Sequence, residues 1–366
     1  MPRATPASPA RSDPDDRHTY ATLDGLRGVA ALAVVFYHFA SDLIAQHGYM
    51  AVDIFFAMSG FVIASAYEGR LTRDLDVRGF LRIRLHRLAP LWILGVVIGL
   101  AMALAVPTPA PARNLILLAL PALFLIPHGL TLVGAFPMNT SLWSLHVEMV
   151  VNLVYARLVR VLTTPVLIGV SATSFAALAV IAYHLDAVSY GTSPLDLVSG
   201  FLRALTTFPM GIVLWRLRAR LPRISVRSPV ILFAAALLMT GLGIVAHSPL
   251  GVTYDLAFIA LAVPTLVSLA VVNEPSEQLR PFFSRLGSGS YALYALHQPI
   301  IQAARRIAAD HGGIPTYLAI ETGLLPGLIL FAWAADRLFD APLRRWLKTW
   351  RSARAGSAGG VRALAS

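Results

Sequence analysis

The segment TLDGLRGVAALAVVFYHFASD places an arginine and a histidine inside an otherwise apolar stretch, from Thr22 to Asp42. Eleven residues bring an α-helix back to nearly the same face, so Arg27 and His38 share one face about 16 Å apart along the axis. Asp42 follows one turn later on that face, where its carboxylate can orient the imidazole of His38. A histidine titrates near neutral pH and can accept a proton from a hydroxyl. The alternative is structural, with Arg27 as an interfacial anchor and His38 as an interhelical hydrogen bonder.

Three further apolar stretches hold polar groups, and ionisable side chains there are costly in a bilayer unless they face a site or a partner. The stretches are AVDIFFAMSGFVIA, with Asp53, Ser59 and Gly60; TSLWSLHVEMVVN, with Trp143, Ser144, His146, Glu148 and Asn152; and GSYALYALHQPI, with Ser290, Tyr291, Tyr294 and His297. Tyr291, Tyr294 and His297 follow one another at intervals of three, which favours one side of a helix. For Ser59 and Gly60 we favour a role in close helix packing.

These stretches belong to a chain with the composition of a membrane protein. Of its 366 residues, 57% are hydrophobic and only 13% are charged, and the mean hydropathy is +0.67. A soluble protein of this length needs a far more charged surface. The predicted fold class is therefore all-α, a polytopic helical bundle in the membrane. The chain has no cysteine, which excludes disulfides, thiolate metal sites and a cysteine nucleophile.

Eleven apolar segments are candidates for membrane spans. They cover residues 26–44, 50–67, 88–106, 113–128, 142–160, 164–183, 197–215, 229–246, 253–272, 288–304 and 314–335. The arginine-rich N-terminal tail, the loops 70–87 and 216–227, and the C-terminal tail should all stay in the cytoplasm.

The two loops are separated by five apolar segments, and an odd number of crossings cannot return the chain to the same side. Segment 113–128 is short and contains Pro121 and Pro127, so we interpret it as re-entrant or interfacial. About ten transmembrane helices then remain, with both termini cytoplasmic. The predicted domains are a flexible N-terminal tail (1–21), a membrane domain (22–340) and a basic C-terminal tail (341–366).

On these stretches the chain resembles the acyltransferase 3 family of integral membrane acyltransferases. DGLRGVAALAVVFYHF carries the family's pattern of Arg, ten residues and His as Arg27 and His38, and RGFLRIRLHRLAPLW carries its R-x-x-R element as Arg84 and Arg87. AVDIFFAMSGFVI, SLWSLHVEM and SYALYALHQP resemble three further family segments. The matches keep the family's order from Leu23 to Pro299, which is essentially the whole membrane domain.

The resemblance implies a multi-pass O-acyltransferase of the inner (cytoplasmic) membrane that uses acyl-coenzyme A, most often acetyl-coenzyme A, as donor. The implied acceptor is a hydroxyl of a glycan or glycolipid, such as lipopolysaccharide or exopolysaccharide, and neither a metal nor a nucleic acid is expected. Guanidinium groups bind phosphate oxygens bidentately, so the candidate donor-binding residues are Arg27, Arg82, Arg84 and Arg87. The alternative for these arginines is an ordinary positive loop that fixes topology.

For the chemistry, His38 is the candidate general base or covalent acyl relay, with Asp42 or Glu148 holding its ring. The candidate donors to the developing oxyanion are Ser144, Tyr291 and Tyr294, whereas His297 is expected to make a structural hydrogen bond. The competing class is a polytopic secondary transporter that couples to protons through intramembrane His, Asp and Arg. The sequence shows no pair of broken helices at matching positions in two halves, which counts against the transporter.

Overall fold

The computed structural model of the protein describes residues 20–40, 45–105, 111–128, 134–188, 194–246, 248–311, 313–347 and 349. In this part of the chain all regular secondary structure is helical, which confirms the predicted all-α class. Asp42 lies outside the described residues, as does nearly all of the N-terminal tail 1–21.

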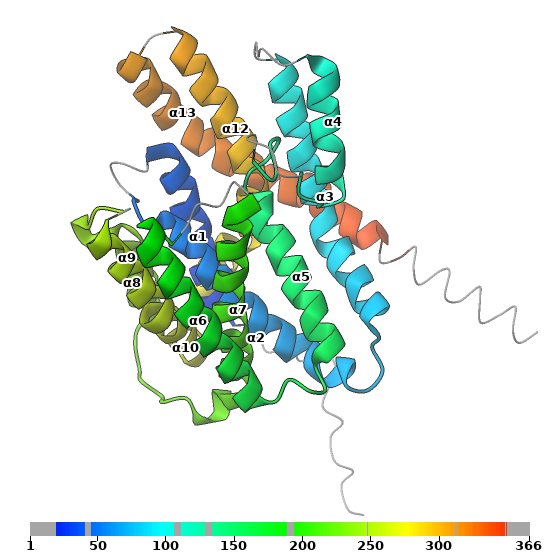
Figure 1. Ribbon diagram of the computed structural model, residues 1–366, viewed down its shortest axis with the longest axis vertical. Helices are drawn as coiled ribbons and strands as arrows, with labels where there is room; N and C mark the ends of the chain where they lie inside the picture. Colours follow the sequence, from blue (N-terminus) through cyan, green and yellow to red (C-terminus); the bar gives the residue numbers. More distant parts are fainter. Residues whose placement is uncertain are drawn as a thin grey trace, which may run out of the picture.

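The helices are long where apolar runs are long, and they form one bundle (Figure 1). They are α1 (Ala21–Ala40), α2 (Ala51–Leu71), α3 (Val77–Ala105), α4 (Ala112–Leu123), α5 (Leu142–Leu158), α6 (Thr164–Leu185), α7 (Pro194–Leu217), α8 (Ser228–Met239), α9 (Pro249–Ala257), α10 (Val263–Val272), α11 (Arg280–Ser288), α12 (Ser290–His311) and α13 (Gly313–Ala334). Short 3₁₀ and π segments join or extend them: η1 (Gly48–Met50), η2 (Arg218–Arg220), η3 (Gly241–Gly243), η4 (Phe258–Ala262) and η5 (Ala335–Asp340).

Five of these helices are long and apolar enough to cross a membrane. They cover Gly48–Leu71, Val77–Ala105, Thr164–Leu185, Leu197–Arg220 and Pro249–Val272. The protein is thus a multi-pass membrane protein, as the composition predicted. The count of ten crossings and the side of each terminus remain predictions.

Two of the eleven apolar segments form shorter helices than their lengths suggested: segment 113–128, which we interpret as re-entrant or interfacial, and the expected span 229–246. Helices α4 and α8 have 12 residues each, so each is about 18 Å long, against roughly 30 Å of bilayer hydrocarbon. In the expected span 229–246 the helix ends at Met239, because Gly241 and Leu242 adopt positive φ angles of 80° and 51°. Helix α4 packs beside α3, where Trp92 Nε1 donates to the Leu123 carbonyl at 3.1 Å.

The loop arginines gather at one end of the bundle, the lower end in Figure 1, which we call the arginine-rich end. It contains the α2–α3 turn with Arg70 and Arg73, the α5–α6 turn with Arg157 and Arg160, and the segment after α7 with Arg218, Arg220 and Arg223. The α3–α4 and α12–α13 pairs rise at the opposite end (Figure 1).

Helices α2 and α7 cross in the centre of the bundle at backbone contact. Gly60 of α2 lies against the Phe208 carbonyl, and Gly211 of α7 lies against the Ala57 carbonyl; a Cβ at either glycine would overlap that oxygen. Small residues allow such close approach between membrane helices. The sequence interpretation of Gly60 as a packing residue is consistent with this geometry.

We expect Gly60→Ala to lower the thermal stability of the detergent-purified protein, because the added methyl forces α2 and α7 apart. Overpacking costs about 1–3 kcal/mol, and we expect the upper part of this range because the added Cβ would overlap a backbone oxygen; that exceeds the roughly 1 kcal/mol that alanine gains in a helix. The matched control is Gly169→Ala on α6, where a Cβ meets nothing within 4 Å. A Gly60→Ala protein as heat-stable as Gly169→Ala would refute the close crossing.

Candidate active site

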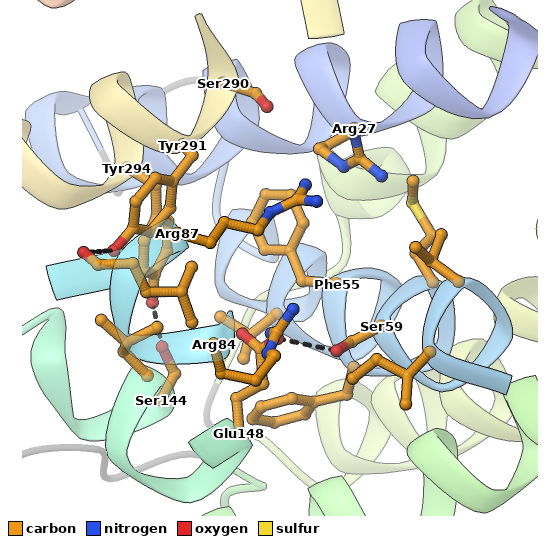
Figure 2. A pocket seen from close by; sticks show the side chains of 17 residues that line it. Arg27, Phe55, Ser59, Arg84, Arg87, Ser144, Glu148, Ser290, Tyr291 and Tyr294 are labelled. Carbon is orange, nitrogen blue, oxygen red and sulfur yellow. Dashed lines mark hydrogen bonds and ion pairs between the residues drawn. The ribbon is translucent and has the colours of Figure 1, made fainter. Parts of the chain in front are cut away.

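A cavity lies among helices α1, α2, α3, α5 and α12, beside Arg84 (Figure 2). Its empty space is about 830 Å³, including the part that is open to solvent. The polar side chains that line it come from α1 (Arg27), α2 (Ser59), α3 (Arg84, Arg87), α5 (Ser144, Glu148) and α12 (Ser290, Tyr291, Tyr294). Apolar residues such as Phe55, Phe56 and Leu145 make up most of the remaining wall. A largely apolar wall with a few convergent polar groups is typical of small-molecule sites.

Arg84 and Glu148 form an ion pair on one wall of the cavity (Figure 2). Arg84 Nη2 lies 2.6 Å from Glu148 Oε1, and the Ser59 hydroxyl donates to the same oxygen at 2.7 Å. The Arg84 side chain is 7% exposed and that of Glu148 is 20% exposed. Glu148 therefore balances a buried arginine, and these contacts do not include the ring of His38.

Two further arginines face the same space. Arg27 Nη1 bonds to Asp24 Oδ1 at 2.9 Å, and Figure 2 shows the guanidinium groups of Arg27 and Arg87 directed into the cavity. Among the described residues, no hydrogen bond or ion pair neutralises Arg87. Three arginines and one glutamate line the cavity, so its charge favours an anion. Arg82 is exposed on α3 and does not line it.

The far wall of the cavity carries hydroxyl groups. The Ser144 and Tyr294 hydroxyls are hydrogen-bonded to each other, and both also reach the Ser141 carbonyl, at 3.1 and 3.3 Å. The Tyr291 hydroxyl donates to the Leu88 carbonyl of α3 at 2.6 Å. The Tyr291 hydroxyl is therefore bound to the backbone of α3, whereas the Ser144 and Tyr294 hydroxyls bond each other and can exchange that bond for one to a ligand.

His38 lies beyond this pair and does not line the cavity. Its Nδ1 lies 3.1 Å from Nε2 of His297, and the ring of His297 is 5.8 Å from that of Tyr294. The sequence analysis gave His297 a structural hydrogen bond; the structure adds a direct contact with His38.

The hydrogen-bond partners define the tautomers of both histidines. His297 Nδ1 lies 2.7 Å from the Tyr294 carbonyl, an acceptor, so this nitrogen carries a proton and Nε2 of the neutral ring accepts. His38 Nδ1 faces that acceptor and the Val34 carbonyl at 2.9 Å, so it carries the proton of a neutral His38. The lone pair of His38 then resides on Nε2, which makes Nε2 the basic atom.

The structure thus brings most of the sequence candidates together, in two groups. The residues of the cavity are Arg27, Arg84, Arg87, Ser144, Glu148, Tyr291 and Tyr294. His38 belongs to the histidine pair beyond it, Arg82 is apart from both, and Asp42 lies outside the described residues.

The sequence analysis did not identify Arg203 as a buried cation. Arg203, 1% exposed, bonds Asp53 through Nη2 at 2.5 Å and the Tyr49 carbonyl at 2.9 Å. The signal was available, because Arg203 interrupts the expected span 197–215 and an arginine within a span needs a partner.

Arg84→Ala should lower the thermal stability of the purified protein, because Glu148 is left in an apolar wall without its cation. Breaking a buried pair costs about 3–5 kcal/mol. Glu148 keeps the Ser59 bond and some exposure, so we expect about 2 kcal/mol, below that range.

The control is Arg87→Ala, three residues along the same helix, which should leave stability nearly unchanged. Equal melting temperatures for the two variants would show that the Arg84–Glu148 pair does not stabilise the fold.

Comparison with known proteins identifies several relatives of this chain. "Protein 2 in picA locus" of Rhizobium radiobacter is 40% identical over 157 residues, which are 38% of this chain and 81% of that protein. "O-acetyltransferase OatA" of Staphylococcus aureus is 27% identical over 359 residues, 88% of this chain and 57% of that protein. "Peptidoglycan O-acetyltransferase OatA" of Listeria monocytogenes is 26% identical over 318 residues, 76% of this chain and 49% of that protein.

The chain therefore spans about half the length of the OatA proteins that it matches. No solved structure matches it. The acyltransferase 3 family model, described as an acyltransferase domain, matches residues 20–337. The matched range includes every described residue that lines the cavity, and it includes His38 and His297. The chain belongs to the acyltransferase 3 family of membrane acyltransferases.

Proposed function

We propose that this protein is an inner-membrane O-acetyltransferase that moves an acetyl group from acetyl-coenzyme A to a hydroxyl of a glycan or glycolipid. The observation that carries the proposal is the order of groups along the bundle. An arginine-lined cavity adjoins the Ser144–Tyr294 pair, and one helical turn further along α12 lies the His297–His38 pair. The residues proposed to bind the donor and those proposed to transfer the proton are thus adjacent but form two separate groups.

The arginine-lined cavity suits the donor. Coenzyme A carries several phosphate charges, and Arg27 and Arg87 present guanidinium groups to the same space. Arg84 is held by Glu148, so its proposed role is to set the charge and shape of the wall, with phosphate binding left mainly to the other two. With the arginine-rich end in the cytoplasm, the donor enters from that side and its thioester points toward Tyr294.

His38 is the proposed proton acceptor, through Nε2. The acceptor hydroxyl oxygen attacks the thioester carbonyl carbon, and its proton passes to His38 Nε2. The carbon–sulfur bond then breaks, and coenzyme A leaves as a thiolate that takes up a proton. Ser144 and Tyr294 are the proposed donors to the oxyanion, since their mutual hydrogen bond can be exchanged for one to the substrate. His297 fixes the His38 tautomer through the Nδ1 contact.

The same lone pair on Nε2 can act as a nucleophile, which gives a covalent acetyl-His38 relay. The two routes differ when acceptor is absent, because only the relay leaves acetyl on the protein. They share the requirement for a neutral His38 with Nε2 unprotonated.

A polar face of α12 leads from the histidines toward the opposite end of the bundle and suits the acceptor. Gln298, Gln302 and Arg305 are spaced by four and three residues, so they share a helix face. The Gln298 and Gln302 amides both donate to the Thr140 hydroxyl, at 2.8 and 3.4 Å. Amide and hydroxyl groups are suited to the hydroxyls of a sugar. The competing transporter function has no comparable use for a cavity with three arginines next to this relay.

The test is acetyl transfer from labelled acetyl-coenzyme A to a sugar acceptor in proteoliposomes. His38→Ala should fold and lose turnover by about 10²- to 10⁴-fold, the usual cost of removing a general base. His297→Ala should lose less, and His297→Gln should recover part of that loss by keeping a hydrogen-bonding partner for His38.

His184→Ala, an exposed histidine on α6, is the control and should transfer at the parental rate. Label retained by the parent without acceptor and lost in His38→Ala identifies the relay. A stable His38→Ala protein with parental turnover would contradict the proposed chemistry.

A further inference from the structure

A second cavity lies at the arginine-rich end, where the start of α1, the segment after α7 and the end of α10 meet. Its empty space is about 990 Å³, including the part open to solvent. The polar residues that line it are Tyr20, Arg218, Arg223, Ser225 and Asn273, and it shares no lining residue with the first cavity. We propose that it is a phosphate-binding site for the headgroup of an anionic lipid or for a soluble phosphate ester.

Asn273 holds the wall of this cavity in place. Its Oδ1 accepts from the Val226 backbone N–H, and its Nδ2 donates to the Ile224 carbonyl, each at 3.0 Å. The Asn273 carbonyl in turn accepts from the Thr22 hydroxyl at 2.5 Å. The segment 224–226 is therefore bound to Asn273 at the end of α10, and Asn273 is bound in turn to the start of α1, so the cavity is a built feature of the fold.

Arg218 is fixed at the mouth of the cavity before any ligand binds. Its guanidinium carbon lies 3.5 Å from the centre of the Trp215 ring, and its Nη1 donates to the Trp215 carbonyl at 2.9 Å. Within the part of the chain that the structure describes, that carbonyl is its single hydrogen-bond acceptor. A guanidinium has five N–H donors, so Arg218 keeps donors for a further oxygen ligand at little cost in side-chain entropy.

The charges around the cavity favour an anion. Of the described residues, two arginines and no carboxylate line it. The neighbouring acidic residue, Glu274, accepts from the Ala21 backbone N–H at 3.1 Å and lies 4.0 Å from Arg280. A phosphate bound between Arg218 and Arg223 thus gains two charge-assisted contacts.

The position of the cavity identifies the membrane surface as the nearest source of phosphate. Trp215 and Tyr20 lie where membrane helices begin and end, the level at which tryptophan and tyrosine are enriched. Basic pockets between helices on the cytoplasmic side are suited to lipid headgroups. A soluble ester offers the same oxygens, so the experiment has an arm for each source.

The test measures binding of labelled phosphatidylglycerol to the purified full chain in mixed micelles at about 0.15 M salt, where long-range attraction is screened. Phosphatidylcholine is the background lipid. We expect saturable binding to the parent and at least a tenfold loss of affinity in the double variant Arg218→Gln, Arg223→Gln. The matched control, Arg157→Gln with Arg220→Gln, removes two arginines of the same end that do not line the cavity and should bind as the parent does.

Ser225→Trp places an indole in the cavity without removing charge and should weaken binding by obstructing the ligand, so the site can still be tested if the arginine variant unfolds. Competition by millimolar glycerol 3-phosphate assigns the site to soluble esters, and its absence assigns the site to lipid. Equal losses in the two double variants, or no saturable binding of either phosphatidylglycerol or labelled glycerol 3-phosphate to the parent, would overturn the site. None of these readouts depends on acetyl transfer.

Discussion

An ionised side chain inside an apolar bundle needs a partner, and this constraint fixes how the helices of the protein meet. Asp53 of α2 bonds Arg203 of α7 where both are almost fully buried. Nearer the arginine-rich end the same two helices are joined again, by Glu68 Oε1 and Arg216 Nε at 2.9 Å. Between these pairs lies the glycine crossing at which the backbones touch. Because unpaired charges are so costly there, the α2–α7 pair has one register, and the cavity is built against its α2 face.

The same constraint explains which charges are available for chemistry. Arg84 is neutralised by Glu148 in the cavity wall and Arg27 is paired with Asp24, whereas Arg87 faces the space with no hydrogen bond or ion pair to another described residue. An anion that enters the cavity supplies the charge balance that the protein leaves incomplete there. Beyond the hydroxyl pair, the hydrogen bonds of the two histidines leave Nε2 as the basic atom of a neutral His38, so the proposed proton acceptor is kept apart from the arginines of the cavity. The proposed division between donor binding and proton transfer follows from this separation.

Local patterns predicted much of this arrangement, and long-range pairing was not predictable from them. Periodicity placed Arg27 and His38 on one helix and correctly favoured an all-helical membrane fold. It could not choose the partner of Glu148, because Arg84 is 64 residues away and nothing local distinguishes it from Arg82 or Arg87. His297 was assigned a structural role for the same reason, since its contact with His38 spans 259 residues. The early end of α8 depends on positive φ angles at Gly241 and Leu242, and an apolar run alone does not encode that turn.

The central claim, that the first cavity holds the phosphates of the donor, is tested most directly by equilibrium binding of coenzyme A to Arg87→Ala and Arg82→Ala. Both variants remove one arginine from α3, but only Arg87 lines the cavity. A charge-assisted hydrogen bond contributes about 1.5–3 kcal/mol, so the account predicts a roughly 10- to 150-fold weaker affinity for Arg87→Ala and the parental affinity for Arg82→Ala. Equal affinities for the two variants, or a greater loss in Arg82→Ala, would contradict it.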